Sequence, residues 1–170
     1  MIGDVSGQTA HTFDIVSRSA AQTVHIGEQL GQKLRPGDIV LLYGEFGAGK
    51  THLTKGIAQG FGSADMVNSP SFVLINQYRS GDAHGRAPIY HVDLYRLEGS
   101  LALAGIGLDE ALDGDGICVI EWAERVGEWL PPDYLAVTLI HIGETERALR
   151  FEPQGWRASA IVSELKRTLC

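Results

Sequence analysis

The segment that most constrains this chain is Gly-Glu-Phe-Gly-Ala-Gly-Lys-Thr at residues 44–51, which matches the pattern Gly-x-x-x-x-Gly-Lys-Ser/Thr in full. An apolar run at residues 39–43, Ile-Val-Leu-Leu-Tyr, precedes it and is typical of a buried strand. Leu53, Ile57 and Phe61 follow at a spacing of four, as on one face of a helix. A strand, a loop and a helix in this order form the context that a phosphate-binding loop requires.

The residue types within this loop suit a nucleoside triphosphate and its metal ion. Glycines allow positive φ and a close approach of the backbone, and a helix that begins near Lys50 adds the positive end of its dipole. Lys50 is expected to reach the β- and γ-phosphates, and the Thr51 hydroxyl to hold Mg²⁺. An incidental glycine-rich turn is the alternative, which the complete match and its flanks disfavour. The predicted nucleotide contacts here are Glu45, Phe46, Gly47, Ala48, Gly49, Lys50, Thr51 and His52.

Length and composition indicate an ordinary globular protein. We expect residues 1–170 to form a single domain, with about residues 1–10 flexible. Apolar residues make up 44% of the chain and charged residues 21%, which argues against disorder. The net charge of −7, with 14 scattered Lys and Arg residues, disfavours direct wrapping of a nucleic-acid backbone. Any connection with RNA is therefore expected to run through a partner protein.

The sequence also suggests a cellular compartment. Its two cysteines, Cys118 and Cys170, offer neither a disulfide framework nor a zinc-ligand spacing, which fits a reducing environment. The first residues lack the features of a secretory signal, and no apolar run approaches the length that spans a membrane. We expect a cytoplasmic protein without a membrane association. The six histidines, His52 and His91 among them, show no metal-ligand grouping and are interpreted as structural or surface residues.

The order of the remaining elements predicts an α/β fold. Besides the strand at 39–43, strands are expected at residues 11–16, 72–78, 89–93, 117–120, 133–142 and 145–151. Helices are expected around Ile26, Leu30 and Leu34, capped by Ser17 or Ser19, after the loop, near 101–104, and around Ile161, Leu165 and Leu169. The prediction is a nucleotide-binding domain of the P-loop NTPase type, with a mostly parallel central sheet, flanking helices and an added antiparallel part.

Two carboxylates are candidates to work beside the loop. Asp93 ends the predicted strand at 89–93, and Glu121 follows the strand at 117–120. Because parallel strands of an open sheet end at the same edge, both are expected near the loop that follows Tyr43. Each could bind Mg²⁺ directly, hold a metal-bound water or orient an attacking water. A helix cap or a surface ion pair is the alternative role for each.

Two further segments have weaker signals. Ser69-Pro70-Ser71-Phe72 could be a loop whose order depends on the γ-phosphate, or a simple turn before a strand. Trp122, next to Glu121, could stack on a nucleotide base or on a partner, or it could be a partly buried structural residue. The residues alone leave both pairs of alternatives open.

Taken together, four motifs closely resemble the bacterial TsaE family. They are residues 44–51, Ser-Pro-Ser-Phe at 69–72, His-Val-Asp-Leu-Tyr-Arg at 91–96 and Glu-Trp at 121–122. The third motif is the most specific of them. The resemblance covers most of the chain, from the first helix to the pair of strands after Pro132.

The resemblance implies an ATPase required to make N6-threonylcarbamoyladenosine in tRNA. In that family the ATPase acts on a TsaB–TsaD heterodimer, so tRNA would be met only through the complex. Carried over to this chain, Lys50 would contact phosphates, Thr51 and Glu121 would be Mg²⁺ ligands, and Asp93 would be the second acidic group. Ser69 to Phe72 would form the mobile loop over the nucleotide.

The chain departs from the family pattern at two places. His52 replaces a second hydroxyl residue that the family usually has after Thr51, which puts a contact from that side chain to the α-phosphate in question. Glu146-Arg147 stands where a Gly-Arg pair is common, and Arg147 is retained as a candidate nucleotide contact.

Two other functions share such a loop. A small-molecule kinase would transfer the γ-phosphoryl group to a metabolite, with Arg79 and Arg86 of the polar segment 79–88 as candidates for its lid. A nucleotide-gated binding module would use ATP to order the loop at 69–72, with negligible hydrolysis. The products formed from ATP would distinguish these alternatives.

Overall fold

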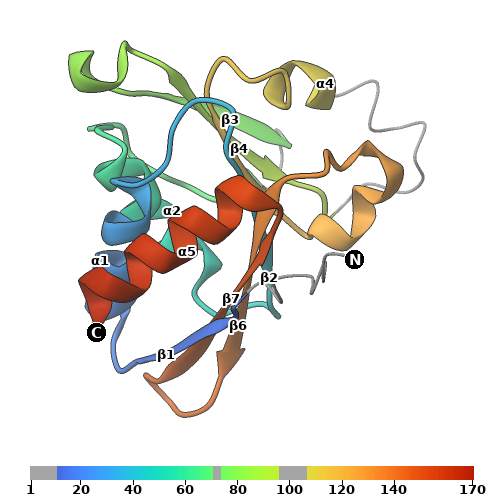
Figure 1. Cartoon of the computed structure of the whole chain (residues 1–170). Coiled ribbons are helices and arrows are strands. Elements are labelled where there is room, and N and C mark those ends of the chain that lie inside the picture. The colour runs from blue at the N-terminus through green and yellow to red at the C-terminus, as the bar shows by residue number, and fades with distance from the viewer. Residues whose placement is uncertain (1–10, 71–73, 96–106) are drawn as a thin grey trace, which may run out of the picture.

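The computed structural model describes residues 11–70, 74–95 and 107–170 (Figure 1). The predictions for residues 1–10, for Ser71 and Phe72, and for a helix near 101–104 lie outside these ranges. The strands are β1 (Phe13–Ser17), β2 (Ile39–Tyr43), β3 (Ile75–Arg79), β4 (Pro88–Asp93), β5 (Ile117–Glu121), β6 (Tyr134–His141) and β7 (Arg147–Gln154). The helices are α1 (Ala20–Gly31), α2 (Lys50–Gly60), α4 (Leu108–Ala111) and α5 (Trp156–Leu169), with short 3-10 helices η1 (Asp82–His84), η2 (Ala123–Arg125) and η3 (Gly127–Trp129).

The seven strands form one sheet in the order β1-β7-β6-β2-β5-β4-β3. The four central strands, β6, β2, β5 and β4, run parallel to one another. Antiparallel strands close both edges, β7 and β1 on one side and β3 on the other. This arrangement confirms the predicted α/β fold with a parallel core, flanking helices and an antiparallel part.

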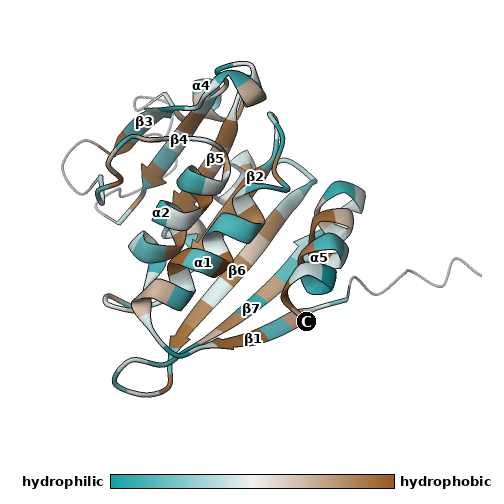
Figure 2. Cartoon of the chain, turned by 90° about the vertical axis from the view of Figure 1, so that its left-hand side faces the viewer, coloured by the Kyte–Doolittle hydropathy of each residue, from teal (hydrophilic) through white to brown (hydrophobic). Residues whose placement is uncertain are grey.

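Both faces of the central strands are buried, and successive residues of a strand enter two different cores. On β2, Val40 and Leu42 pack into the core beneath α1, α2 and α5, whereas Ile39 and Leu41 pack into the core beneath α4, η2 and η3. Figure 2 shows α1, α2 and α5 together on one face of the sheet. This burial on both faces explains why β2 and β5 are continuous apolar runs in the sequence.

Glycines bring α1 and α2 into direct backbone contact. A Cβ atom on Gly27 would lie 2.4 Å from the carbonyl oxygen of Leu53, and one on Gly56 would lie 2.0 Å from that of Val24. Gly31 and Gly60 are equally close to the facing helix. Only a hydrogen atom fits at these positions, so the four glycines fix how α2 sits against α1.

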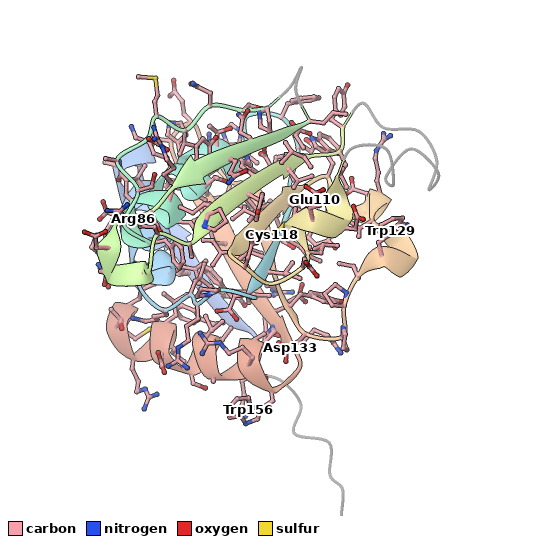
Figure 3. The ribbon with its side chains drawn as sticks, turned by 90° about the horizontal axis from the view of Figure 1, so that it is seen from above. Arg86, Glu110, Cys118, Trp129, Asp133 and Trp156 are labelled. Carbon is pink, nitrogen blue, oxygen red and sulfur yellow. The ribbon has the colours of Figure 1, made fainter. Side chains whose placement is uncertain are left out.

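The N-cap position of helix α5 is Gly155, which has no side chain to cap the helix. Asp133, just before β6, accepts hydrogen bonds from the backbone N–H groups of Arg157 and Ala158 at 3.1 Å each. Figure 3 shows Asp133 beside the start of this helix and Trp156 projecting outward from it. The cap is thus supplied from a distant part of the chain, where no local sequence signal could reveal it.

Several boundaries differ from the predictions for local reasons. The strand predicted at residues 72–78 begins at Ile75, since Leu74 has a φ of 68° and its N–H bonds to the carbonyl of Pro70. Helix α1 ends at Gly31, before Leu34, and its N-cap is Ser19, whose side chain accepts from the N–H of Gln22. In the part of the chain that the structure describes, no helix is long and apolar enough to cross a membrane.

Candidate functional site

Three neighbouring parallel strands end at the same edge of the sheet and bring the predicted polar residues together. Strand β2 leads into the glycine-rich loop, β4 ends in Asp93 and β5 ends in Glu121. Asp93 and Glu121 are direct neighbours in the register of β4 and β5. The expectation that both carboxylates emerge beside the loop is therefore met by the topology of the sheet.

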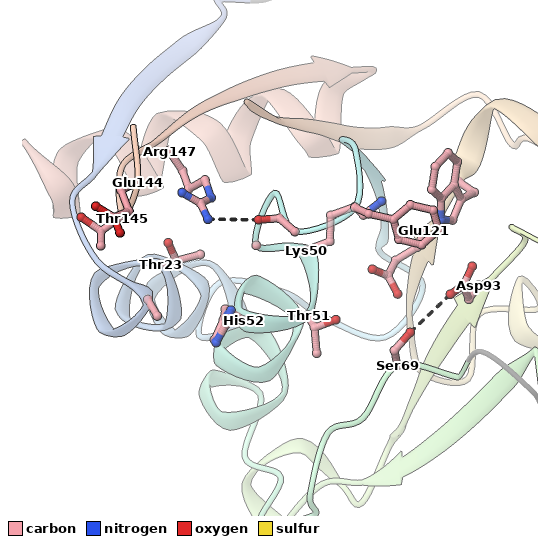
Figure 4. Close-up of a pocket in the computed structure, with 15 residues that line it drawn as sticks. Thr23, Lys50, Thr51, His52, Ser69, Asp93, Glu121, Glu144, Thr145 and Arg147 are labelled. Atoms are coloured by element: carbon pink, nitrogen blue, oxygen red, sulfur yellow. Dashed lines mark hydrogen bonds between the residues drawn. The ribbon is translucent and has the colours of Figure 1, made fainter. Parts of the chain in front are cut away.

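A cavity of about 360 Å³ lies at this edge (Figure 4). Most of the predicted site residues line it, while Glu45 is solvent-exposed and Ala48 is buried in the core beneath the loop. The lining residues are Ala20, Thr23, Phe46, Gly47, Gly49, Lys50, Thr51, His52, Ser69, Asp93, Glu121, Trp122, Glu144, Thr145 and Arg147.

The loop has the backbone conformation that its glycines permit. Gly47 has a φ of 77° and Gly49 a φ of 103°, both in the region that residues with a Cβ rarely adopt. Gly49 is also the N-terminal cap position of α2, and it has no side chain that could cap the helix. The first N–H groups of α2 are therefore available to an anion at the loop.

Lys50 lies along this loop with its side chain largely buried. Its Nζ donates a hydrogen bond to the carbonyl of Gly44 and lies 4.2 Å from the centroid of the Trp122 ring. The ammonium group is thus held at the cavity wall by a carbonyl dipole and an aromatic face, two contacts that a phosphate could replace.

Trp122 belongs to a cluster of three aromatic rings at one end of the cavity. Its ring centroid lies 5.4 Å from that of Phe46 and 4.9 Å from that of Tyr95, and Phe46 and Tyr95 are 4.7 Å apart. Trp122 has a φ of 59°, which is unusual for a residue with a Cβ. The cluster gives the cavity an apolar wall next to its charged residues.

Asp93 and Glu121 are both buried and face the cavity from neighbouring strands. Asp93 Oδ1 accepts from the N–H of Tyr95 at 2.9 Å, and its Oδ2 accepts from the hydroxyl of Ser69 at 3.4 Å. Oε2 of Glu121 lies 2.9 Å from Nε2 of His91. Neither carboxylate is a helix cap or an exposed ion pair, so these alternatives do not apply here.

The contact of His91 was not expected from the sequence. His91 is fully buried, and its other ring nitrogen, Nδ1, lies 3.0 Å from the hydroxyl of Tyr78. The alternation of side chains along β4 was a usable signal, because it places His91 on the same face of the strand as Asp93. What the sequence lacked was the register that brings Glu121 of β5 beside both residues.

The turn between β6 and β7 supplies the opposite wall of the cavity. Nη2 of Arg147 donates to the carbonyl of Gly47 at 3.0 Å, which places this guanidinium on the glycine-rich loop (Figure 4). Glu144 and Thr145 line the cavity from the same turn, and Thr23 lines it from α1. The last three have no motif in the sequence, and only the folded chain brings them to the site.

The donor set fits a hard divalent cation such as Mg²⁺. Thr51, Asp93 and Glu121 offer one hydroxyl and two carboxylates, and Mg²⁺ is typically bound by one or two carboxylates together with substrate phosphates and water. Over residues 11–70, 74–95 and 107–170, no group of three or more His, Cys, Asp or Glu residues forms a metal-binding cluster. Thr51, Asp93 and Glu121 can therefore form a complete metal site only together with a polyphosphate that contributes the remaining ligands.

Comparisons with known proteins agree with this geometry. Residues 17–149 match the model of a family described as "Threonylcarbamoyl adenosine biosynthesis protein TsaE". The chain is 41% identical over 133 residues to the tRNA threonylcarbamoyladenosine biosynthesis protein TsaE of Bacillus subtilis strain 168, covering 78% of this chain and 80% of that protein. It is 40% identical over 134 residues to the protein of the same name from Treponema pallidum strain Nichols, covering 79% and 96%.

Among solved structures, the chain is similar to the crystal structure of YdiB from Bacillus subtilis. The TM-score is 0.78 and the sequence identity 33%, with 93% of this chain and 96% of that chain covered. The similarity therefore extends over nearly the whole length of both chains.

Proposed function

From the premise that this chain belongs to the TsaE family, we propose that it is a Mg²⁺-dependent ATPase that serves the synthesis of N6-threonylcarbamoyladenosine in tRNA. The observation that carries the ATPase assignment is a single cavity lined by the glycine-rich loop, Lys50 and two buried carboxylates. Such a site can bind a polyphosphate with its metal ion and polarise the terminal phosphoryl group.

Each residue has a role in this proposal. The N–H groups of the loop and of the first turn of α2 would bind phosphate oxygens, and Lys50 would leave Gly44 and Trp122 to contact the β- and γ-phosphates. Thr51 and Glu121 would hold Mg²⁺, which when bound neutralises charge on the phosphate oxygens. Asp93 would be the second acidic group, and it already accepts a hydrogen bond from the hydroxyl of Ser69.

The proposal includes partners and a place in the cell. We assign the TsaB–TsaD heterodimer as the complex on which ATP turnover acts, and the cytoplasm as the compartment. The net charge of −7 supports an indirect relation to tRNA, because a phosphate backbone would be repelled rather than attracted by the chain as a whole. Because ATP turnover acts on the partner complex in this proposal, we expect the isolated protein to hydrolyse ATP weakly.

The test compares ATP hydrolysis by the chain alone and in the presence of TsaB and TsaD. We expect turnover to rise with the partners and to be lost in Lys50→Ala and Glu121→Ala, while Arg150→Ala, an exposed residue outside the cavity, serves as the control. Equal turnover in all variants, with or without the partners, would contradict the proposal. Detection of a phosphorylated metabolite would instead indicate a kinase, and release of intact ATP would indicate a nucleotide-gated module.

A further inference from the structure

A chain of buried hydrogen bonds connects Glu121 to the backbone before Ser69. Oε2 of Glu121 contacts Nε2 of His91 at 2.9 Å, and Nδ1 of His91 contacts the hydroxyl of Tyr78 at 3.0 Å. The Tyr78 oxygen lies 3.0 Å from the carbonyl and 3.3 Å from the amide nitrogen of Asn68. His91 is fully buried and Glu121 nearly so, which makes an unmet hydrogen bond at either residue costly.

The chemistry of a carboxylate sets the direction of the bond between His91 and Glu121. An ionised carboxylate only accepts, so His91 donates to Glu121 from Nε2. The hydroxyl of Tyr78 has one proton, which it can donate to Nδ1 of His91 or to the carbonyl of Asn68, and its oxygen accepts from the N–H of Asn68. The carbonyl of Asn68 also accepts from the side-chain amide of Asn76 at 3.2 Å, so it keeps a donor when the Tyr78 proton points to His91. Each polar group of the chain therefore has a partner.

From this geometry we infer that His91 is a positioning residue for the carboxylate of Glu121. The bond from Nε2 fixes one carboxylate oxygen and restrains rotation of the group about its last side-chain bond, while Tyr78 fixes the orientation of the imidazole ring. Glu121 is thereby held toward the cavity that it lines. The inference rests on the proposed function in one respect, since it assigns the held carboxylate to the metal ion of the nucleotide.

A merely structural histidine would predict a different behaviour. If His91 only filled space in the core, its replacement would change stability and would alter nucleotide affinity equally with and without Mg²⁺. A positioning role predicts that the loss appears in the Mg²⁺-dependent part of the affinity. Removing a group that orients a metal ligand typically costs about 10- to 100-fold in metal affinity.

Two conservative variants separate these possibilities. The side-chain amide of Gln reaches the place of Nε2, so His91→Gln keeps a donor for Glu121. The shorter Asn places its amide where Nδ1 was, so His91→Asn loses that donor. His25→Asn on the surface of α1 is the matched control, since it makes the same chemical change at an exposed site. Thermal unfolding of each variant shows whether it is folded.

The measurement is the calorimetric affinity for ADP with Mg²⁺ and with a chelator. The gain from Mg²⁺ is the ratio of the ADP affinity with Mg²⁺ to the ADP affinity with the chelator. We expect His91→Asn to reduce this ratio about tenfold or more. We expect His91→Gln and His25→Asn to keep it within about threefold of wild type. The affinity without metal should be the same in all four proteins. A folded His91→Asn protein with the wild-type gain, or equal losses in both His91 variants, would overturn the inference.

A second measurement does not depend on nucleotide. A double-mutant cycle between His91→Asn and Glu121→Gln, followed by urea unfolding, should show a coupling of about fivefold or more in the unfolding equilibrium constant. Additive effects within about twofold would overturn the inference. If the wild-type protein binds no nucleotide, the proposed function fails, while this cycle still decides whether His91 holds Glu121.

Discussion

The ammonium group of Lys50 lies 4.2 Å from the centroid of the Trp122 ring, so the cation of the glycine-rich loop and the residue after Glu121 are in direct contact. The two residues come from different strand ends and are far apart in the sequence. A cation above an indole ring changes the electrostatic environment of that ring. The electrostatic environment of the Trp122 ring therefore depends on the position of Lys50, the residue that would bind the phosphates.

We predict that nucleotide binding changes the fluorescence of Trp122, because the phosphates draw Lys50 away from the ring. Titration with Mg²⁺ and ADP should give a saturable change in emission. Trp122→Phe should abolish it. Trp156→Phe should leave it intact, since Trp156 is exposed at the start of α5. An unchanged signal in Trp122→Phe would contradict the prediction.

Arg147→Ala should weaken nucleotide binding. The Arg147 guanidinium contacts the carbonyl of Gly47 and holds the glycine-rich loop from the β6–β7 turn. The loss of one such partly exposed contact is expected to reduce affinity about threefold to tenfold, as measured by calorimetry. Arg150→Ala is the matched control on the same strand, where the exposed arginine pairs with Asp14 instead. Equal affinities in the two variants would show that the contact has no part in binding.

Gly56→Ala should destabilise the protein although alanine is the better helix former. In an exposed helix this change would stabilise by about 1 kcal/mol. Here the new Cβ would lie 2.0 Å from the carbonyl oxygen of Val24, so the helices must separate. We expect a loss of about 2–3 kcal/mol in urea unfolding.

Gly143→Ala is the control for this change, since the atoms nearest to its Cβ would be side-chain atoms of Glu146 at 3.4 Å or more. The stability of Gly143→Ala should stay close to wild type. A stabilised Gly56→Ala protein would mean that α1 and α2 are not in backbone contact.

The two thiols should differ sharply in reactivity. Burial raises the pKa of the Cys118 thiol from its ordinary 9.0 to about 12, whereas Cys170 is exposed. At pH 8 a thiol reagent should modify one cysteine in the folded chain and the second only after unfolding, since the thiolate is the reacting form. Cys170→Ser should leave no fast-reacting thiol. Two fast thiols in the native protein would contradict the buried position of Cys118 in β5.

The same shift has a consequence for stability. The folded state keeps Cys118 protonated up to about pH 12, whereas the unfolded chain ionises it near 9.0. The contribution of this thiol to stability is therefore constant below pH 9 and is lost as the pH rises from there toward 12. Cys118→Ala should flatten the alkaline part of the curve of unfolding free energy against pH.

Much of the fold could be predicted because its signals are local. The apolar runs of β2 and β5 mark strands buried on both faces, and the spacing of Leu53, Ile57 and Phe61 marks the buried side of α2, with Phe61 as its C-cap residue. The pattern at residues 44–51 predicted the loop, since its glycines permit the positive φ angles found at Gly47 and Gly49. The role of Lys50 stays a prediction. The strand ends at Asp93 and Glu121 followed from the rule that parallel strands end at one edge.

The rest depends on contacts between distant residues. The link from Arg147 to Gly47 spans a long stretch of sequence and arises only because β6 pairs with β2. The cap that Asp133 provides for α5 and the contact of His91 with Glu121 also join distant residues, and they depend on the pairing of β6 with β7 and of β4 with β5. Individual residues do not reveal register, so these partners emerge only when the sheet is assembled.

The glycine contact between α1 and α2 has a mechanical consequence for the cavity. Two helices whose backbones touch cannot slide past each other without breaking that contact, so the wall formed by α2 and the start of α1 behaves as a fixed platform. Under the proposed function, motion that accompanies ATP turnover would then involve the part of the cavity lining outside this helix pair, which includes Ser69 and Trp122. A partner protein that responds to the bound nucleotide would then contact the part of the cavity lining that includes Ser69 and Trp122.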